Sequence, residues 1–272
     1  MRDLKYMLKD LTDAMEVDSQ KVVPTRWQGV DVSQRPEATM MELLHVNAEA
    51  ALLGEDLDYY REQIRPNLPW ADDHFMERVC GHPINPGIEW KNWPWGNSAE
   101  KSLRDGQFNH NYMERYWPRY ARAGVGNPTR TVQDFIDLKP ESSPLRGIRH
   151  EYGDLAGLVR DLATEPDTRQ AYLPVWFPED TGDAHKGRKP CSLGYHFIMR
   201  NGKLDVVYYL RSCDFAHHLR DDVYLTVRLL LWVLDECRKI NPEVWQHVTP
   251  GRLVMQITSL HMFINDYNRM FK

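Results

Sequence analysis

The order of the predicted elements indicates an α/β (α+β) fold, a layered domain with a mixed sheet. Residues 154–164 have the spacing of an amphipathic helix, residues 222–238 form a long apolar helix, and strand-like runs lie between and after them. Helix, strands, hairpin, helix and strand in this order are typical of a sheet covered by helices. Because 272 residues with 42% hydrophobic content can bury one large core, we expect a single domain over residues 1–272.

Two helices are predicted in the N-terminal part of the chain. In the first fifteen residues, apolar side chains recur every three or four positions, at Leu4, Met7, Leu8, Leu11 and Met15. Similar spacing from Met40 to about Arg65 predicts a second helix, broken near Gly54 and ended by Pro66. We expect the apolar face of the first helix to pack in the core.

Residues 66–128 form a Trp/Pro-rich loop region within this domain. Its composition favours packed loops and short helices over an open linker. The tryptophans either anchor irregular backbone to the core or form a pocket wall, and anchoring is the commoner role for any one of them. They are Trp70, Trp90, Trp93, Trp95 and Trp117.

The strands are predicted in the C-terminal half. Strand-like runs cover residues 171–176, 193–200 and 203–211, and Asn201-Gly202 between the last two is a strong hairpin signal. Residues 253–257 form a short final strand after the long helix.

The composition indicates a protein that binds a small anion. The net charge of -5 and the pI near 6.1 give no general attraction for nucleic acid, so a phosphate is expected to be held by a few placed cations. The first residues are too charged for a secretory signal, and no apolar run approaches the roughly 20 residues that cross a bilayer. We expect a cytoplasmic protein with neither a nucleic-acid nor a membrane partner.

No metal site is predicted. The four cysteines lack paired metal-ligand spacing, and they are Cys80, Cys191, Cys213 and Cys237. The histidine groupings match no tetrahedral zinc pattern, and they are His185 with Cys191 and His196, and the pair His217-His218.

Three residues of the C-terminal half together describe chemistry on a pyrimidine nucleotide. Cys191 offers a thiolate nucleophile, Arg211 a guanidinium for a phosphate dianion, and Asp222 a carboxyl group for the edge of a base. Each has an ordinary structural explanation too. Cys191 can be a small buried side chain, Arg211 can pair with Asp214, and Asp222 can cap the helix that it begins.

This segment resembles the thymidylate synthase family over roughly residues 150 to 265. The family has a Pro-Cys nucleophile, an Arg-Ser-x-Asp motif and a polar base-reading residue at the spacing of Pro190-Cys191, Arg211-Ser212-Cys213-Asp214 and Asp222, and a later run similar to Ser259-Leu260-His261. Thymidylate synthases have Asn at the base-reading position, whereas cytidylate (dCMP/CMP) 5-hydroxymethylases have Asp. The resemblance is therefore closest to the second branch. It implies a large bent mixed sheet with helices on one face and a homodimer formed through the other.

The resemblance implies transfer of a one-carbon unit from 5,10-methylenetetrahydrofolate to C5 of CMP or dCMP. The Cys191 thiolate adds to C6, C5 attacks the one-carbon unit, and water captures the resulting exocyclic methylene as hydroxymethyl. Cytosine has an acceptor at N3 beside an amine at C4, so Asp222 can accept from the amine and, when protonated, donate to N3. Two alternatives remain open: a C5-methylating synthase that releases dihydrofolate, and a non-catalytic nucleotide-binding protein on the same scaffold.

Further roles are implied for residues around the nucleotide. Arg211 and Ser212 are expected to bind the phosphate, and Asp214 the folate. Arg169 matches the first of two arginines that reach across the dimer, and Gln170 replaces the second. Cations near Cys191 in sequence favour its thiolate if they are near in space, and they are Lys186, Arg188, Lys189 and Arg211.

The remaining implied residues lie in shorter matches. Arg26 is similar to an N-terminal phosphate-binding arginine, although a surface role explains it equally well. His261 is expected to hold the sugar, but Phe263 replaces a tyrosine there and leaves ribose or deoxyribose open. Tyr112 is expected to face the nucleotide and the folate, and Glu62 to organise water and protons. Family members continue for several tens of residues after this histidine and cover the folate with that tail, whereas eleven residues follow His261 here. We therefore expect either that residues 70–95 cover the folate or that its binding is altered.

Overall fold

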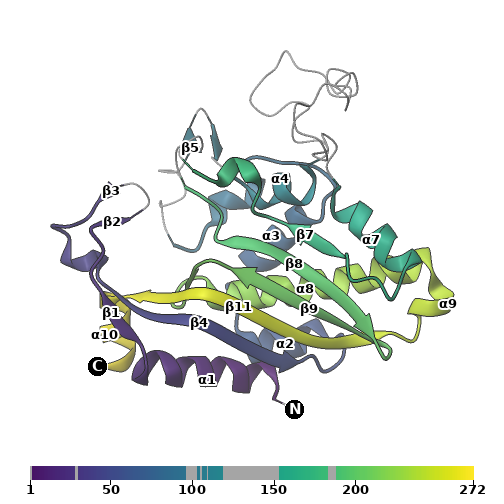
Figure 1. Ribbon diagram of the computed structural model, residues 1–272, viewed down its shortest axis with the longest axis horizontal. Helices are drawn as coiled ribbons and strands as arrows, with labels where there is room; N and C mark the ends of the chain where they lie inside the picture. The colour runs from purple at the N-terminus through teal and green to yellow at the C-terminus, as the bar shows by residue number, and fades with distance from the viewer. Residues whose placement is uncertain are drawn as a thin grey trace.

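A mixed sheet of seven strands lies at the centre of the structure, a computed structural model that describes residues 2–27, 30–95, 103–104, 106–108, 110–118, 153–182 and 188–272 (Figure 1). Its order is β1-β4-β11-β9-β8-β7, and β10 pairs with β11. β11 is parallel to β9 and β10, and the other neighbours are antiparallel. The strands are β1 (Gln20–Val22), β4 (Met40–Ala51), β7 (Tyr172–Pro174), β8 (Ser192–Arg200), β9 (Lys203–Leu210), β10 (Cys213–Asp214) and β11 (Thr249–Phe263). Two small hairpins are β2 (Arg26–Trp27) with β3 (Val30–Asp31), and β5 (Leu103–Arg104) with β6 (Gln107–Phe108).

Helices cover one face of the sheet and lie behind it in Figure 1. α8 (Leu219–Ile240) packs on β9 and β11, and buries apolar side chains such as Val223, Leu230 and Leu234. Since α2, α3 and α7 pack on α8 in turn, one continuous core forms between helices and sheet. The other helices are α1 (Leu4–Val17), α2 (Leu57–Ile64), α3 (Trp70–Arg78), α4 (Tyr112–Tyr116), α7 (Leu155–Thr164), α9 (Pro242–Trp245) and α10 (Ile264–Phe271). Short 3-10 helices are η1 (Pro36–Ala38), η2 (Ile88–Asn92) and η6 (Pro178–Asp180).

The predicted layered fold with a mixed sheet is confirmed, and most elements lie where they were expected. The Asn201-Gly202 turn joins β8 to β9, and both residues have positive φ, as a tight hairpin turn requires. The prediction for residues 40–51 was wrong, because this run is strand β4 and only residues 57–64 are helical. β4 pairs with β1 and β11, and this pairing overrides the helical spacing. The last strand is also far longer than predicted, since β11 covers Thr249–Phe263.

The sheet brings the motif residues together at one end. Cys191 directly precedes β8, and the Arg211 amide, directly after β9, donates to the Cys191 carbonyl at 2.9 Å. Asp214 lies in β10, and Asp222 lies in the first turn of α8. The hairpin and the start of α8 therefore hold the predicted nucleophile and base reader near each other.

Candidate active site

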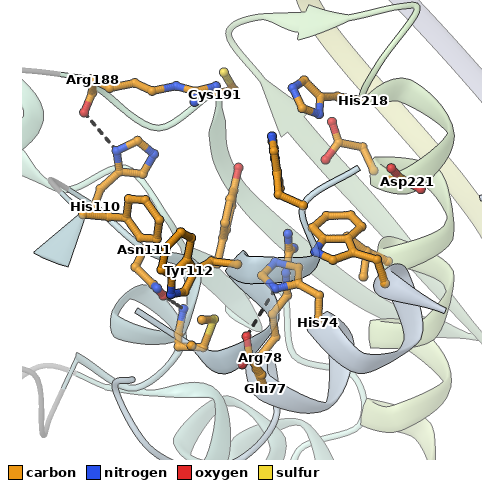
Figure 2. A pocket seen from close by; sticks show the side chains of 18 of the residues that line it. His74, Glu77, Arg78, His110, Asn111, Tyr112, Arg188, Cys191, His218 and Asp221 are labelled. Carbon is orange, nitrogen blue, oxygen red and sulfur yellow. Dashed lines mark hydrogen bonds and ion pairs between the residues drawn. The ribbon is translucent and has the colours of Figure 1, made fainter. Parts of the chain in front are cut away.

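A cavity lies between α3, α4, the β8–β9 end of the sheet and the start of α8 (Figure 2). Figure 2 shows Cys191 and His218 on one side of it, and His74, Glu77 and Arg78 on the other. The predicted site residues that line it are Tyr112, Cys191, Ser212, Asp214 and Asp222. Those not among its lining residues are Arg26, Glu62, Arg169, Arg211 and His261.

Cys191 is half-buried and faces cations. Burial raises the pKa of its thiol, while the nearby Arg211 and Arg188 guanidinium groups oppose that rise. The net direction is upward, so the free protein holds Cys191 mainly as a thiol at neutral pH. Lys186, which was expected to assist, lies outside the described residues.

Asp222 is a carboxyl group whose pKa lies near neutral pH. Burial raises its pKa to about 7, against the opposing charge of Arg78 and with a further rise from Asp221. Its side chain accepts from Tyr208 Oη and Cys213 Sγ, both at 3.5 Å. The N-cap residue of α8 is His218, and no side-chain capping bond forms there, so Asp222 does not cap the helix.

Arg78 is a cation that the sequence did not single out. Only 4% of it is exposed, yet its guanidinium makes no hydrogen bond or ion pair with any residue that the structure describes. It lies over the ring of Tyr112, 4.2 Å from the centroid. An unpaired desolvated cation is costly, so a ligand atom that accepts hydrogen bonds would be favoured here. The available signal was the spacing of Trp70, His74 and Arg78, which places them on one face of α3.

Arg211 lies at the rim beside Cys191 and is exposed. Its Nε and Nη2 donate to the carbonyls of Pro190 and Lys189 at 2.7 and 3.1 Å. No carboxylate pairs with it among the described residues, so the expected alternative of a salt bridge to Asp214 does not occur there. Two carbonyls thus orient the guanidinium, and its other donors are available to a phosphate.

Asp214 and His261 hold the turn that precedes α8. Asp214 Oδ1 accepts from the amides of Ala216 and His217 at 3.0 and 3.1 Å, and its Oδ2 lies 3.0 Å from His217 Nδ1. His217 Nε2 lies 3.8 Å from Asp266 Oδ2 on α10. His261 Nδ1 lies 3.3 Å from Ser212 Oγ, so the predicted sugar residue contacts the predicted phosphate residue.

Three predicted residues lie on the surface away from the cavity. Arg26 is exposed on β2, Glu62 is exposed on α2, and Arg169 is exposed with its carbonyl 3.0 Å from His196 Nε2. The glutamate among the described lining residues is Glu77, on α3. The structure therefore does not bring Glu62 to the place where water and protons would be organised.

Aromatic rings form a wall of the cavity. Trp70 lies 5.1 Å from Trp93 and stacks on His74 with centroids 4.9 Å apart, and Trp95 lies 4.6 Å from His218. Flat apolar walls of this kind suit a planar heterocycle such as a pterin. Among the described residues, no cluster of three or more His, Cys, Asp or Glu side chains could hold a metal ion. None of the described helices is long and apolar enough to cross a membrane.

Comparison with known proteins gives a family match and distant relatives. The family profile described as thymidylate synthase matches residues 87–271. A thymidylate synthase of Rhodopseudomonas palustris (strain BisA53) is 24% identical over 120 residues, which are 44% of this chain and 37% of that protein. A bifunctional dihydrofolate reductase-thymidylate synthase of Paramecium tetraurelia is 25% identical over 42% of this chain and 22% of that protein. A deoxyuridylate hydroxymethyltransferase of Bacillus phage SP01 is 29% identical over 42% of this chain and 28% of its own length. Each match covers well under half of the relative.

Proposed function

Because this chain belongs to the thymidylate synthase family, we propose that it transfers a one-carbon unit to C5 of a pyrimidine nucleotide, with CMP or dCMP as substrate and the 5-hydroxymethyl nucleotide as product. The observation that carries the proposal is the shared cavity of Cys191, Asp222 and Tyr112, with two guanidinium groups acting on the thiol. A nucleophile, an acid and a cation around one cavity are the parts that activation of C5 needs.

In this proposal Cys191 attacks C6 of the base and Asp222 donates a proton to N3. Electrons that enter the ring from the thiolate reach N3, where a protonated Asp222 neutralises them. A pKa of about 7 supports this role, because the acid form is well populated at neutral pH. Asn would present an amide instead, which suits uracil.

The phosphate is proposed to bind at the cavity rim, at Arg211 and Ser212. Both lie beside Cys191, and His261 contacts Ser212, so phosphate and sugar groups would extend from the base along this edge. Arg169 and Arg26 lie elsewhere on the surface. In this proposal Arg169 acts on the phosphate of a second subunit, and Arg26 is a further phosphate-binding arginine.

The aromatic wall fits methylenetetrahydrofolate as co-substrate. When bound, the folate supplies the one-carbon unit at the oxidation level of formaldehyde. Trp70, Trp93 and His218 would flank its ring system. Asp214, the predicted folate contact, has both carboxylate oxygens occupied by the turn, so its contribution would be to hold that turn in place.

A homodimer is proposed through the open face of the sheet. Leu43 packs against the core, so its neighbour Leu44 points to the other face, where it is 53% exposed. Tyr172 is 41% exposed and lies 6.2 Å from the ring of Tyr209. We also propose a reducing, cytoplasmic setting, which the unpaired state of all four cysteines supports.

The proposed reaction is tested with CMP, dCMP, UMP and dUMP, each supplied with methylenetetrahydrofolate, by product mass. Hydroxymethyl products from cytidylates alone would support it. One relative is named a deoxyuridylate hydroxymethyltransferase, which makes dUMP the rival substrate, and turnover of dUMP alone would overturn the role given to Asp222. Release of dihydrofolate would instead identify a methylating enzyme.

A second measurement tests covalent catalysis against mere nucleotide binding. We expect Cys191→Ala to slow exchange of the C5 hydrogen of cytidylate by at least about 10³-fold, because the adduct that activates C5 cannot form. Cys80→Ala, at an exposed site outside the cavity, is the matched control and should exchange normally. A binding protein would show no exchange in either variant.

A further inference from the structure

His74 and Glu77 form a histidine–carboxylate pair inside the cavity. They lie three residues apart on α3, and His74 Nδ1 is 3.5 Å from Glu77 Oε2 (Figure 2). Both side chains line the cavity. Neither belongs to the motif residues that the sequence had singled out.

Glu77 is held rigidly by the segment that follows α3. Its Oε1 accepts from the Glu89 amide at 2.9 Å. A Cβ at Gly87 would lie only 2.1 Å from Glu77 Oε2, so the carboxylate occupies space that only glycine leaves open. Although burial opposes it, the neighbouring His74 and the bond from the Glu89 amide lower the pKa of Glu77, which is therefore an anion at neutral pH.

His74 is fixed on its other side by an aromatic ring. It stacks on Trp70 with centroids 4.9 Å apart and an interplanar angle of 12°. Its Nδ1 faces Glu77, and its Nε2 makes no hydrogen bond with any residue that the structure describes. A carboxylate that orients an imidazole while the second nitrogen remains available is the arrangement of a general base.

The other cavity histidines lack this arrangement. His110 Nδ1 is taken by the Arg188 carbonyl at 2.9 Å. His218 is packed against Trp93 and Trp95, and no carboxylate pairs with it in the described parts of the chain. Among the described histidines that line the cavity, the carboxylate partner is therefore specific to His74.

The proposed reaction contains a step that needs such a base. Hydroxymethyl forms only when water adds to the exocyclic methylene on C5, and the water proton must be accepted as the C–O bond forms. Tyr112 is unsuited because burial raises its pKa well above the ordinary value, and Asp222 already serves N3. Burial and the Arg78 cation lower the pKa of His74 to about 4, so its acceptor form is populated throughout the neutral range. A reactive methylene needs only a weak base.

We propose that His74, oriented by Glu77, is the catalytic base that takes the proton from the water that captures the exocyclic methylene. This inference rests on the proposed function. The water oxygen bonds to the methylene carbon, its proton passes to His74 Nε2, and the electron pair of the exocyclic double bond moves into the ring. That pair then expels the Cys191 thiolate from C6 as the C5–C6 double bond returns. Glu77 is a positioning residue that stabilises the imidazolium.

The test runs the last step backwards without folate. Wild-type protein is incubated with 5-hydroxymethyl-CMP in H₂¹⁸O, and incorporation of ¹⁸O into the hydroxymethyl group is followed by mass spectrometry. In parallel, exchange of the C5 hydrogen of CMP with solvent is measured. This exchange needs the proposed steps at Cys191 and Asp222 but not the addition of water, so it does not depend on the proposed role of His74. We expect His74→Gln to lose at least about 10²-fold in oxygen exchange and to keep hydrogen exchange within about threefold.

Further variants separate positioning from folding. Glu77→Gln and Gly87→Ala, which remove or displace the orienting carboxylate, should lower oxygen exchange by about tenfold and leave hydrogen exchange intact. His247→Gln makes the same chemical change at an exposed site and should alter neither reaction.

The possible failures are distinguishable. A wild-type protein that exchanges neither atom refutes the proposed function itself. If His74→Gln exchanges oxygen like the wild type, His74 is not the base although the proposed function stands. If the variant loses both reactions together, His74 serves the site as a whole and the specific role in water capture is refuted.

Discussion

At the scale of single residues, the charge state of the site depends on two side chains that do not touch, Arg78 and Asp222. Arg78 and Asp222 line the same cavity without forming an ion pair, and the Arg78 charge lowers the pKa of Asp222 from a distance. Burial raises the pKa of Asp222 to about 7, and Arg78 holds it from rising further. The carboxyl group is thereby kept able to give and to take a proton at physiological pH.

This balance predicts a pH dependence. Exchange of the C5 hydrogen of cytidylate needs both the Cys191 thiolate, whose population rises with pH because its pKa is raised, and the acid form of Asp222. The exchange rate should therefore rise about tenfold per pH unit below about pH 7 and form a level limb above it, where the loss of the Asp222 acid offsets the gain of thiolate. Asp222→Asn should remove this limb and shift preference from CMP towards UMP by roughly 10²-fold or more. The measurement is the exchange rate between pH 5.5 and 9.

Substitution of Arg78 tests its effect on the pKa of Asp222. Arg78→Met removes the cation that favours the carboxylate, so the same limb should move to higher pH. Because the guanidinium makes no hydrogen bond or ion pair with the described residues and methionine can also pack on the Tyr112 ring, this variant should unfold no more easily than the wild type. A limb that stays at about pH 7 in Arg78→Met would contradict the electrostatic coupling between the two side chains.

At the scale of elements, Cys191 is placed by an irregularity at the start of β8. The register of β8 against β9 shifts between Ser192 and Gly194. A Cβ at Gly194 would lie 2.4 Å from Tyr172 Oη and 2.6 Å from the Leu173 carbonyl. Because that carbonyl belongs to the backbone of β7, it cannot move aside without opening the sheet edge.

Gly194→Ala should therefore cost about 1–3 kcal/mol of folding free energy. The nearby nucleophile should also be displaced, so C5 hydrogen exchange should fall more than the stability loss explains. Urea denaturation and the exchange assay measure the two effects. Gly153→Ala is the control, because nothing lies within 4 Å of a Cβ there. Equal stabilities for the two variants would show that β7 yields at this point.

The same elements show what the sequence could predict. The β8–β9 hairpin and α8 follow from a local turn signal and a long apolar period, and the structure confirms both. Residues 40–51 carry apolar residues at spacings that also fit a helix, and only pairing with β11, some 200 residues later, makes them a strand. His74, Glu77 and Arg78 were missed for a similar reason. A charged stretch of a short helix resembles a solvated surface until the fold turns it into a cavity.

At the scale of the whole molecule, one face of the sheet is covered and the other is open within the described residues. Figure 1 shows α2, α3 and α8 behind the sheet and the other face of the sheet towards the viewer. Exposed apolar side chains on a sheet face, such as Leu44 on β4, are typical of an interface. The proposed homodimer would bury this face.

Leu44→Glu is predicted to weaken that dimer at least about tenfold, since a carboxylate would be buried against the partner's apolar surface. Sedimentation velocity over a concentration series measures it. Val17→Glu, at a site on α1 that is 77% exposed, is the matched control and should leave the assembly unchanged. If both variants and the wild type sediment as monomers at every concentration, the open face is not a self-association surface.

The chain of contacts from Asp214 through His217 to Asp266 joins a cavity wall to the last described helix. The loop before α8 is thereby tethered to α10, none of whose residues is among those that line the cavity. A substitution on α10 that removes the Asp266 contact would let the loop before α8 move more, and the proposed substrate base would be held less precisely. Substitutions on α10 are thus expected to change the turnover rate without altering Cys191, Asp222 or Arg211.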